Sequence, residues 1–319
     1  MLLKADQIKG CYGIICTPST PGADHWSAVD TVDTAETSRL VGSLVDDGCT
    51  GVIALGTTGE VATLTESEFR VAAEAVVRGV AGRVPTIIGA TALGTHQTIE
   101  RLKFVQDLGA TGTMLGLPMW QPCTEDMAVR FYAGIAEAFP DLTVMIYMNV
   151  RAFRFDFPVS FWERVVDVAP NVTCAKYGAT PPLAELVEAT RGRVKFLVND
   201  MAVVEPAMAL PDHIDTCWAT AASMGPRPIV KLMDAVAARD WETAKAIDAD
   251  IKWSIETFFP PKREEFGLYN IQLEKLRMQG AGYCNPGPIR PPYDVVPEDY
   301  AAGALECGRR WKELVAKYA

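Results

Sequence analysis

The chain has 319 residues, of which 49% are hydrophobic, and a formal net charge of −10. This length and apolar content are enough for one large core, whereas the acidic excess argues against nucleic acid or an anionic membrane as a partner. No apolar stretch is long enough to span a bilayer, and the opening residues MLLKADQIKGCYG lack the apolar core of a signal peptide. We therefore expect a soluble cytoplasmic protein.

Cysteine and histidine are poorly arranged for metal or triad chemistry. The eight cysteines form no CxxC pair, and several lie in apolar strand-like runs, which is typical of buried free thiols in a reducing compartment. The histidines, His25, His96 and His213, lie far apart and form no HxH or HExxH pattern. A zinc site built on histidine and a Ser-His-Asp triad are therefore both disfavoured.

Short apolar, β-branched runs alternate with amphipathic stretches along most of the chain. Nearly continuous apolar strands are what a parallel sheet covered on both faces requires. The pattern predicts a (β/α)8 barrel; the runner-up is a doubly wound open sheet, which the absence of GxGxxG after the first strand weakens. The predicted strands are 11–18, 51–56, 85–90, 112–118, 143–149, 172–178, 194–200 and 215–222, with helical stretches between them that include 35–47, 66–80, 97–108 and 124–138.

After about residue 238 the strand pattern stops and helical periodicity continues. The helical segments expected there are 241–258, 264–279 and 297–317, and a Pro/Gly-rich connector, GYCNPGPIRPPYD, joins the last two. We therefore predict a catalytic barrel over 1–238 and a C-terminal helical extension over 239–319 that packs on it.

Active sites of such barrels lie at the carboxyl ends of the strands, and the sixth strand ends in an unusual lysine. Lys176 lies in NVTCAKYGA, an otherwise uncharged run. Loss of hydration lowers the pKa of a lysine and leaves more neutral amine, which can attack a ketone and form a Schiff base. The alternative is a lysine that reaches solvent from the strand end. Lys195 begins the seventh strand at the opposite end of the barrel, so it receives no catalytic role.

Three polar residues near other strand ends complete a candidate site. Tyr147 ends the fifth strand, beside Lys176, where its phenol could relay protons to the forming carbinolamine; the alternative is an ordinary core tyrosine. Thr57 and Thr58 lie in GTTGE after the second strand. Hydroxyl and N–H groups of a glycine-flanked turn at a helix start can bind a small carboxylate; the alternative is a capped turn. Glu60 is expected to be a helix-start residue.

These residues together resemble a known family. GTTGE after the second strand, Tyr147 and Lys176 look like the dihydrodipicolinate synthase/N-acetylneuraminate lyase family of pyruvate-handling class I aldolases, over nearly the whole chain. The resemblance implies a barrel, a Schiff base at Lys176, a proton relay through Tyr147 and carboxylate binding at Thr57 and Thr58. It also implies assembly as a homotetramer.

The resemblance is not equal to every branch of that family. The synthase branch has Tyr-Asn-Val-Pro followed closely by Arg, whereas this chain has IYMNVRAFRFDFP, with one extra residue between Tyr147 and Asn149. The stretches GTMLGLPMW, FRFDFPVSFW, AKYG, YNIQLEK and GPIRPPYDVVPEDY instead look like hydratase-aldolases of aromatic degradation. Such enzymes cleave trans-o-hydroxybenzylidenepyruvate or trans-2'-carboxybenzalpyruvate to an aromatic aldehyde and pyruvate. By this resemblance Asn149, Trp218 and Asn270 also line the site.

The expected activity needs only a small pyruvyl substrate and no metal or organic cofactor, because one lysine imine serves both hydration and carbon–carbon cleavage. Trp120, after the fourth strand, and Trp218, near the end of the eighth, could hold a flat aryl ring. Phe153 and Phe155 could do the same, although packing is the favoured role for this pair. Trp120 could also pack against the extension or another subunit.

Three further questions stay open at the level of sequence. Within the fold, the alternatives are a dihydrodipicolinate synthase or a sugar-acid lyase; from another class, the alternative is a catalytically silent relative that binds pyruvate. The ortho substituent of the ring is either hydroxyl or carboxylate, and Arg151 and Arg154 favour carboxylate if they face it. The group that activates the hydrating water is not predicted.

Overall fold

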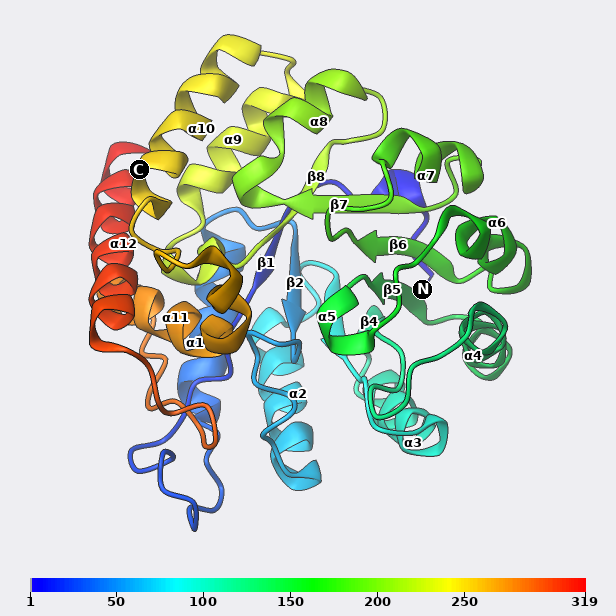
Figure 1. Ribbon diagram of the computed structural model, residues 1–319, viewed down its shortest axis with the longest axis horizontal. Helices are drawn as coiled ribbons and strands as arrows, with labels where there is room; N and C mark the ends of the chain where they lie inside the picture. The colour runs from blue at the N-terminus through cyan, green and yellow to red at the C-terminus, as the bar shows by residue number, and fades with distance from the viewer. Residues whose placement is uncertain (1) are drawn as a thin grey trace. The chain divides into compact units, whose positions relative to one another are not determined.

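A computed structural model of the protein describes residues 2–319 and contains a closed parallel barrel (Figure 1). The strands follow one another around the barrel in the order of the sequence, β1 to β8. The predicted (β/α)8 fold is thereby confirmed. The strands are β1 (Gly10–Ile14), β2 (Gly51–Ala54), β3 (Thr86–Gly89), β4 (Gly112–Leu115), β5 (Thr143–Tyr147), β6 (Val172–Lys176), β7 (Lys195–Asn199) and β8 (Thr216–Ala219).

Helices separate the strands and continue to the end of the chain. The helices are α1 (Thr34–Asp46), α2 (Glu66–Val80), α3 (Thr95–Asp107), α4 (Glu125–Ala138), α5 (Val150–Phe153), α6 (Val159–Val168), α7 (Leu183–Ala189), α8 (Val204–Ala209), α9 (Arg227–Ala237), α10 (Trp241–Ile255), α11 (Phe266–Ala281) and α12 (Glu298–Lys317). Short 3-10 turns are η1 (Ala5–Gln7), η2 (Asp200–Ala202), η3 (Ala221–Met224) and η4 (Arg263–Glu265).

Local sequence explains where these elements begin and end. The predicted strand runs overlap the observed strands but mostly extend past their carboxyl ends, because the residues that follow stay buried after strand pairing stops. Helix α2 has its predicted bounds, since Thr65 and Glu68 form a reciprocal capping box at its start. At its end Ala81 adopts a left-handed conformation, which ends the helix.

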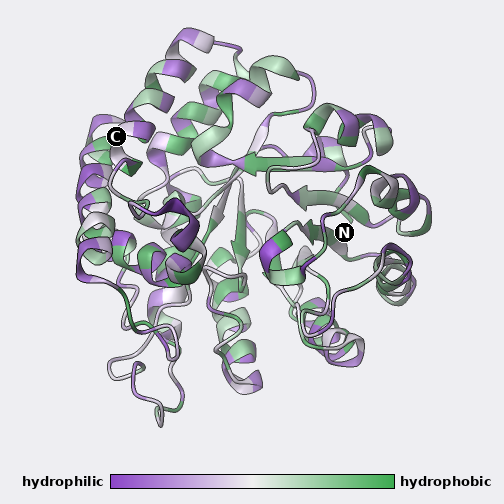
Figure 2. Cartoon of the chain, in the orientation of Figure 1, coloured by the Kyte–Doolittle hydropathy of each residue, from purple (hydrophilic) through white to green (hydrophobic). Residues whose placement is uncertain are grey.

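The described chain is divided into two compact units. The first contains the residues up to Gly10 and Pro85–Trp218, with strands β3 to β7 and most of β8. Every residue of β4 and β5 is buried, and in Figure 2 the helices α4 and α6 carry both hydrophilic and hydrophobic residues. Arg164 of α6 pairs with Glu125 of α4 at 2.6 Å, so these two helices are also joined at their exposed side.

The second unit contains Cys11–Val84 and Ala219–Ala319. It therefore holds β2 and all of β1 but its first residue, with α1 and α2, together with the C-terminal helices α9 to α12. Helices α11 and α12 lie side by side (Figure 1), and the fully buried Trp311 of α12 donates from Nε1 to the carbonyl of Gly225 at 2.9 Å. The domain boundary between residues 238 and 239 stays a prediction.

Candidate active site

Lys176 and Tyr147 are register partners at the carboxyl ends of two paired strands. Tyr147 ends β5 and Lys176 ends β6, and the two residues stand opposite each other in the β5–β6 ladder. The Nζ atom of Lys176 lies 4.9 Å from the centroid of the Tyr147 ring. The sequence-predicted pair is thus brought together by strand register, and side chains at these positions can act on one reacting atom.

Trp218 lies directly against the same amine. The Lys176 Nζ atom is 3.4 Å from the centroid of the Trp218 ring, well within the range of a cation–π contact. The indole is fixed in turn, because its Nε1 donates to the carbonyl of Tyr177 at 3.0 Å. The structure therefore places Trp218 beside the proposed nucleophile, within the first compact unit.

Asn149 orients the Tyr147 hydroxyl. The Asn149 side-chain oxygen accepts from the backbone N–H of Ala152 at 3.2 Å and caps the single-turn helix α5. This bond turns the amide nitrogen toward the phenol, to which it donates at 3.3 Å. Because the phenol oxygen accepts there, its own proton is directed elsewhere. The residue inserted between Tyr147 and Asn149 thus lies directly before the cap residue of α5, whose side chain donates to the phenol.

The phenylalanines after β5 are core residues. Phe153 and Phe155 are both buried. The Phe153 ring packs edge-on against Tyr147 with ring centroids 5.4 Å apart, and Phe155 packs against Phe157 at 5.0 Å. The packing interpretation of this pair is supported, and Phe153 also holds the catalytic candidate Tyr147 in place.

Arg154 binds a loop instead of standing free. Its Nη2 donates to the carbonyl of Trp120 at 2.6 Å and also to that of Met119, which fixes the loop after β4. The Trp120 side chain is 77% exposed, so no wall of the described site buries it. Arg151 is exposed. The argument for an ortho carboxylate loses strength, because the guanidinium of Arg154 already satisfies two carbonyls.

The GTTGE turn after β2 differs from the expected helix start. Helix α2 begins only at Glu66, and residues 57–63 form turns. The expectation that this turn stands at a helix start, and that Glu60 is a helix-start residue, is therefore wrong, whereas the predicted helix over 66–80 is confirmed. The sequence instead builds a tight turn: a Cβ added at Gly59 would lie 2.7 Å from the backbone nitrogen of Leu55. Thr58 is buried and Thr57 is half-buried within it.

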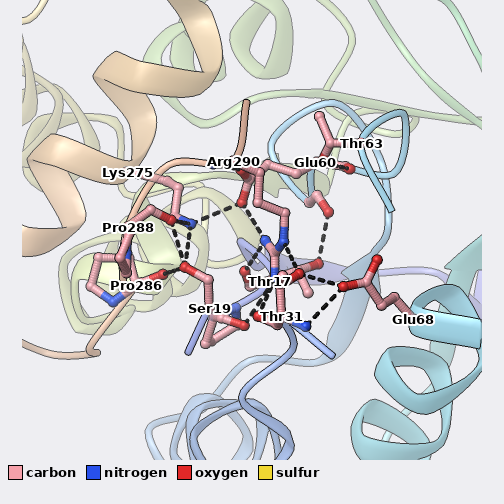
Figure 3. Close-up of polar contacts among 12 residues, drawn as sticks. Thr17, Ser19, Thr31, Glu60, Thr63, Glu68, Lys275, Pro286, Pro288 and Arg290 are labelled. Atoms are coloured by element: carbon pink, nitrogen blue, oxygen red, sulfur yellow. Dashed lines mark hydrogen bonds and ion pairs between the residues drawn. The ribbon is translucent and has the colours of Figure 1, made fainter. Parts of the chain in front are cut away.

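Glu60 is the anchor of that turn. It is fully buried, with a left-handed backbone at φ 53°. Its carboxylate accepts from the Nζ atom of Lys275 and from Nη1 of Arg290, both at 2.9 Å. Figure 3 shows this cluster, whose side chains come from the turn, from α11 and from the C-terminal connector.

Asn270, on α11, also belongs to the second unit. It is half-buried, and its Oδ1 atom is buried with no hydrogen-bond partner among the described residues. The buried side of this helix also carries an ion pair between Glu274 and Arg277, whose Nη2 and carboxylate oxygen are 2.7 Å apart. An unsatisfied carbonyl oxygen is a position where a ligand donor could bind.

Other predictions concern residues outside the site. Lys195 begins β7, and its Nζ donates to Asp215 at 2.6 Å and to the carbonyl of His213 at 3.2 Å. All eight cysteines are free, and all but Cys123 are buried, as predicted. Within residues 2–319, no group of three or more His, Cys, Asp or Glu side chains is placed to hold a metal ion. No helix in that range is long and apolar enough to cross a membrane.

Comparison with known proteins identifies the family of the chain. A model of the dihydrodipicolinate synthetase family matches residues 12–301. The chain belongs to this family. Family membership confirms the resemblance first seen in GTTGE, Tyr147 and Lys176, and it covers nearly the whole length of the chain.

Within the family, the similarity is to aromatic hydratase-aldolases. The chain is 42% identical to the trans-O-hydroxybenzylidenepyruvate hydratase-aldolase of Sphingobium xenophagum, over 98% of this chain and 96% of the relative. It is 35% identical to the trans-2'-carboxybenzalpyruvate hydratase-aldolase of Nocardioides sp. (strain KP7), over 98% of this chain and 95% of the relative. The solved structure of PhdJ bound to a substrate intermediate superimposes with a TM-score of 0.96, at 36% identity, and the match covers 99% of each chain.

The charged residues that hold the GTTGE turn were not predicted from the sequence. Lys275 and Arg290 lie far from Glu60 in the chain, in a helix and in a proline-rich connector. One signal was present: Arg290 is the single charge of the proline-rich stretch GPIRPP, and Lys275 ends the stretch YNIQLEK on a predicted helix. A charge in such a context predicts a buried partner, but the partner cannot be named from sequence alone.

Proposed function

We propose that the protein is a Schiff-base hydratase-aldolase that hydrates and cleaves an aryl-substituted unsaturated pyruvate to an aromatic aldehyde and pyruvate. Two of its relatives carry hydratase-aldolase names for such substrates. The observation that carries the proposal is the position of the Lys176 amine, whose Nζ atom lies 4.9 Å from the centroid of the Tyr147 ring and 3.4 Å from that of the Trp218 ring. A nucleophile, a proton-transfer group and an aromatic surface are what this reaction requires.

The first step is imine formation. The neutral Lys176 amine attacks the C2 ketone, a carbinolamine forms, and loss of water gives the iminium. Tyr147 transfers protons to and from the carbinolamine oxygen, with its phenol aligned by the hydrogen bond from Asn149. The cationic imine then withdraws electrons along the conjugated double bond.

Hydration and cleavage follow on the same imine. Water adds to the aryl-bearing C4, and C3 takes up a proton. The new hydroxyl then loses its proton as the C3–C4 bond breaks, so the aldehyde leaves and the electron pair forms an enamine. Protonation of C3 and hydrolysis of the iminium release pyruvate and restore Lys176. No step requires a metal ion or an organic cofactor.

The remaining predicted residues receive binding roles. We assign the substrate carboxylate to Thr57 and Thr58, whose turn carries the family motif. Trp218 is assigned to the aryl ring or to the reacting carbon beside it, since its ring already lies against the amine. Asn270, with its unsatisfied Oδ1, is assigned to a substrate donor group. Trp120 is assigned to the outer edge of the ring, because its side chain is largely exposed.

We favour a substrate with an ortho hydroxyl group over one with an ortho carboxylate. The sequence favoured carboxylate only through Arg151 and Arg154, and Arg154 is bound to backbone carbonyls. The named relative with a hydroxyl-bearing substrate also has the higher identity of the two, 42% against 35%. Both substrates nonetheless use the same chemistry at the pyruvyl end.

Assembly as a homotetramer in the cytoplasm is part of the proposal. It is supported by membership of the family and by the composition of the chain. Light scattering during size-exclusion chromatography measures the assembly, and a mass of one protomer would contradict it.

A substrate panel tests the proposed reaction. Purified protein is given benzylidenepyruvates with ortho hydroxyl or ortho carboxylate, N-acetylneuraminate, and pyruvate with aspartate semialdehyde, all in the presence of EDTA. Release of aromatic aldehyde is followed by absorbance, and we expect the benzylidenepyruvates to react far faster than the others. A preference for the sugar acid or the semialdehyde would support the lyase or synthase alternatives, and inactivity on all of them would support the silent relative.

A further inference from the structure

A second cluster of buried charges lies outside the proposed chemistry. Its members are drawn in Figure 3. Glu60 contacts Lys275 and Arg290, and Arg290 is joined through Thr31 to Glu68. Two carboxylates therefore balance two cations within one connected network. Buried charges are retained only when they are paired and hydrogen-bonded, and a network of this extent calls for a reason beyond stability.

Glu60 is held at both carboxylate oxygens. Oε1 accepts from the backbone N–H of Arg290 at 3.1 Å, and Oε2 accepts from Lys275 and from the Arg290 guanidinium. A left-handed backbone is unfavourable for a glutamate, and it persists only where surrounding contacts fix it. The network supplies those contacts, so the backbone conformation at Glu60 depends on two distant residues.

Lys275 uses all its hydrogen-bond donors on oxygen. Nζ donates to the carboxylate of Glu60, to Ser19 Oγ at 3.1 Å and to the carbonyl of Pro288 at 2.6 Å. Three acceptors account for the three N–H groups of an ammonium. The residue is 1% exposed. Lys275 is therefore a structural cation that ties α11 both to the turn and to the connector.

Arg290 joins the connector to the residues after β1. Nη1 donates to the carbonyl of Thr17 at 3.0 Å, and Nη2 donates to that of Thr31 at 2.8 Å. The connector approaches closely here: a Cβ added at Gly287 would lie 2.0 Å from the carbonyl oxygen of Ser19. The Pro/Gly-rich connector is thus a built element, shaped to place Arg290 against Glu60.

The same network controls the carbonyl next to the threonine pair. The Thr17 hydroxyl donates to the carbonyl of Gly59 at 2.7 Å, while the carbonyl of Thr17 itself accepts from Arg290. Gly59 and Glu60 immediately follow Thr58, and the N–H of Glu60 returns to the carbonyl of Thr57 at 2.9 Å. The conformation of the pair is therefore fixed through the residues on its carboxyl-terminal side.

We propose that Glu60, Lys275 and Arg290 are positioning residues that set the geometry of Thr57 and Thr58 for the substrate carboxylate. This inference rests on the proposed function for the carboxylate contact. The three residues act through the turn and do not touch substrate. A misplacement of about 1 Å can cost on the order of 10²-fold in activity, so a turn fixed in this way gives the C-terminal helix and connector direct influence on substrate affinity.

Three variants test the inference. Glu60→Gln keeps the shape of the side chain but removes the charge that both cations face. Thr17→Val is milder: it removes the hydroxyl that holds the Gly59 carbonyl and buries no unpaired charge. The matched control is Glu274→Gln, which breaks a buried ion pair with Arg277 on the same helix, a pair that involves no residue of the turn.

Two measurements separate positioning from stability. The first is the pyruvate concentration that gives half-maximal borohydride trapping at Lys176, with the maximal trapping rate. The second is amide hydrogen exchange of the peptide that contains residues 55–61. We expect Glu60→Gln and Thr17→Val to raise the half-maximal concentration by about 10- to 100-fold, with maximal trapping within about threefold of wild type and faster exchange in the turn. Glu274→Gln is expected to lower Tm alone.

The outcomes are distinct. The positioning role would be overturned if all three variants changed trapping equally. It would also be overturned if Thr17→Val changed neither trapping nor hydrogen exchange in the turn. If Glu60→Gln does not fold, Thr17→Val against the control decides. Failure of the wild type to trap pyruvate would overturn the proposed function instead. In that case, faster hydrogen exchange in Thr17→Val but not in Glu274→Gln would still support the role of the network in positioning the turn.

Discussion

Lys176 and Lys275 show how one residue type is directed to two tasks by its surroundings. The Lys275 amine donates to a carboxylate, a hydroxyl and a carbonyl, which together fix its position. The Lys176 amine lies against the rings of Trp218 and Tyr147 at the end of a strand. One of these rings carries the phenol to which we assign proton transfer. Lys176 thus lies among the aromatic groups of the proposed site, whereas Lys275 lies among the oxygen atoms of a structural network.

Removal of the proposed nucleophile is expected to have the largest effect on activity. Lys176→Ala deletes the atom that forms the imine, so we expect aldehyde release to fall on the order of 10⁴-fold or more. Lys195→Ala is the control, because its partners Asp215 and His213 lie outside the site. Steady-state kinetics on both variants checks this. Comparable activity loss in both would assign the effect to folding and not to imine chemistry.

The next effect concerns the phenol. Tyr147→Phe keeps the ring that packs on Phe153 and faces the amine but removes the hydroxyl. We expect kcat to fall by about 10²- to 10⁴-fold, the range for a positioned proton-transfer group.

A buried tyrosine of another kind gives the control for this change. Tyr132 is fully buried and donates to the carbonyl of Leu115 at 2.9 Å, so Tyr132→Phe also loses one hydrogen bond. It is expected to lower Tm with kcat within about threefold of wild type. Near-native turnover of Tyr147→Phe would return Tyr147 to the role of a core residue.

Substitution of Trp218 separates effects on the lysine from effects on aryl binding, because we assign its ring to contacts with both the amine and the aryl ring. Trp218→Ala is expected to lower kcat/KM for an ortho-hydroxybenzylidenepyruvate by about 10-fold, given about 0.5–1.5 kcal/mol for an aromatic pair beyond area burial. Borohydride trapping of free pyruvate at Lys176 should persist, and Trp218→Phe should recover most of the loss. An equal loss for pyruvate and for the aryl substrate would show that Trp218 serves only the lysine.

The smallest expected effect concerns the alignment of the phenol. Asn149→Asp keeps the oxygen that caps α5 but removes the donor to Tyr147. We expect kcat to fall by about 3- to 10-fold, the value of one hydrogen bond, with little change in Tm. Asn149→Ala loses the cap as well and is expected to be less stable by about 1 kcal/mol. If the aspartate variant matches wild type, the Asn149–Tyr147 bond has no part in turnover.

Much of the fold and of the chemistry could be predicted from sequence, because both depend on local patterns. Buried strands of a parallel barrel read as continuous apolar runs, and a charged residue at the end of one of them is conspicuous. Lys176 was found in this way, and its neighbour Tyr147 followed from the order of the strands. The bounds of α2 were correct because Thr65 and Glu68 give a complete capping signal.

The turn after β2 could not be predicted in the same way. Its conformation depends on Lys275 and Arg290, more than 200 residues away along the chain, and no periodicity connects such positions. Glu60 was read as a helix-start residue because acidic residues favour the first turn of a helix. The tertiary contacts override that preference by holding the backbone at a positive φ.

The partner of Arg154 could not be predicted for a related reason. An arginine beside a candidate site suggests an anion, since guanidinium groups bind carboxylates well. The same group can instead satisfy backbone carbonyls, and the structure shows it bound to the loop that carries Trp120. Sequence identifies the donor, but only the folded chain identifies the acceptor.

Covalent trapping compares the two lysines most directly. The wild-type protein is incubated with pyruvate and borohydride, digested, and examined by mass spectrometry for the reduced adduct. We expect a stoichiometric adduct on Lys176 and none on Lys275, whose amine donates hydrogen bonds to three oxygen atoms. An adduct on Lys275 or on another lysine, or no adduct at all, would contradict the central claim that the aromatic-faced amine at the end of β6 is the nucleophile.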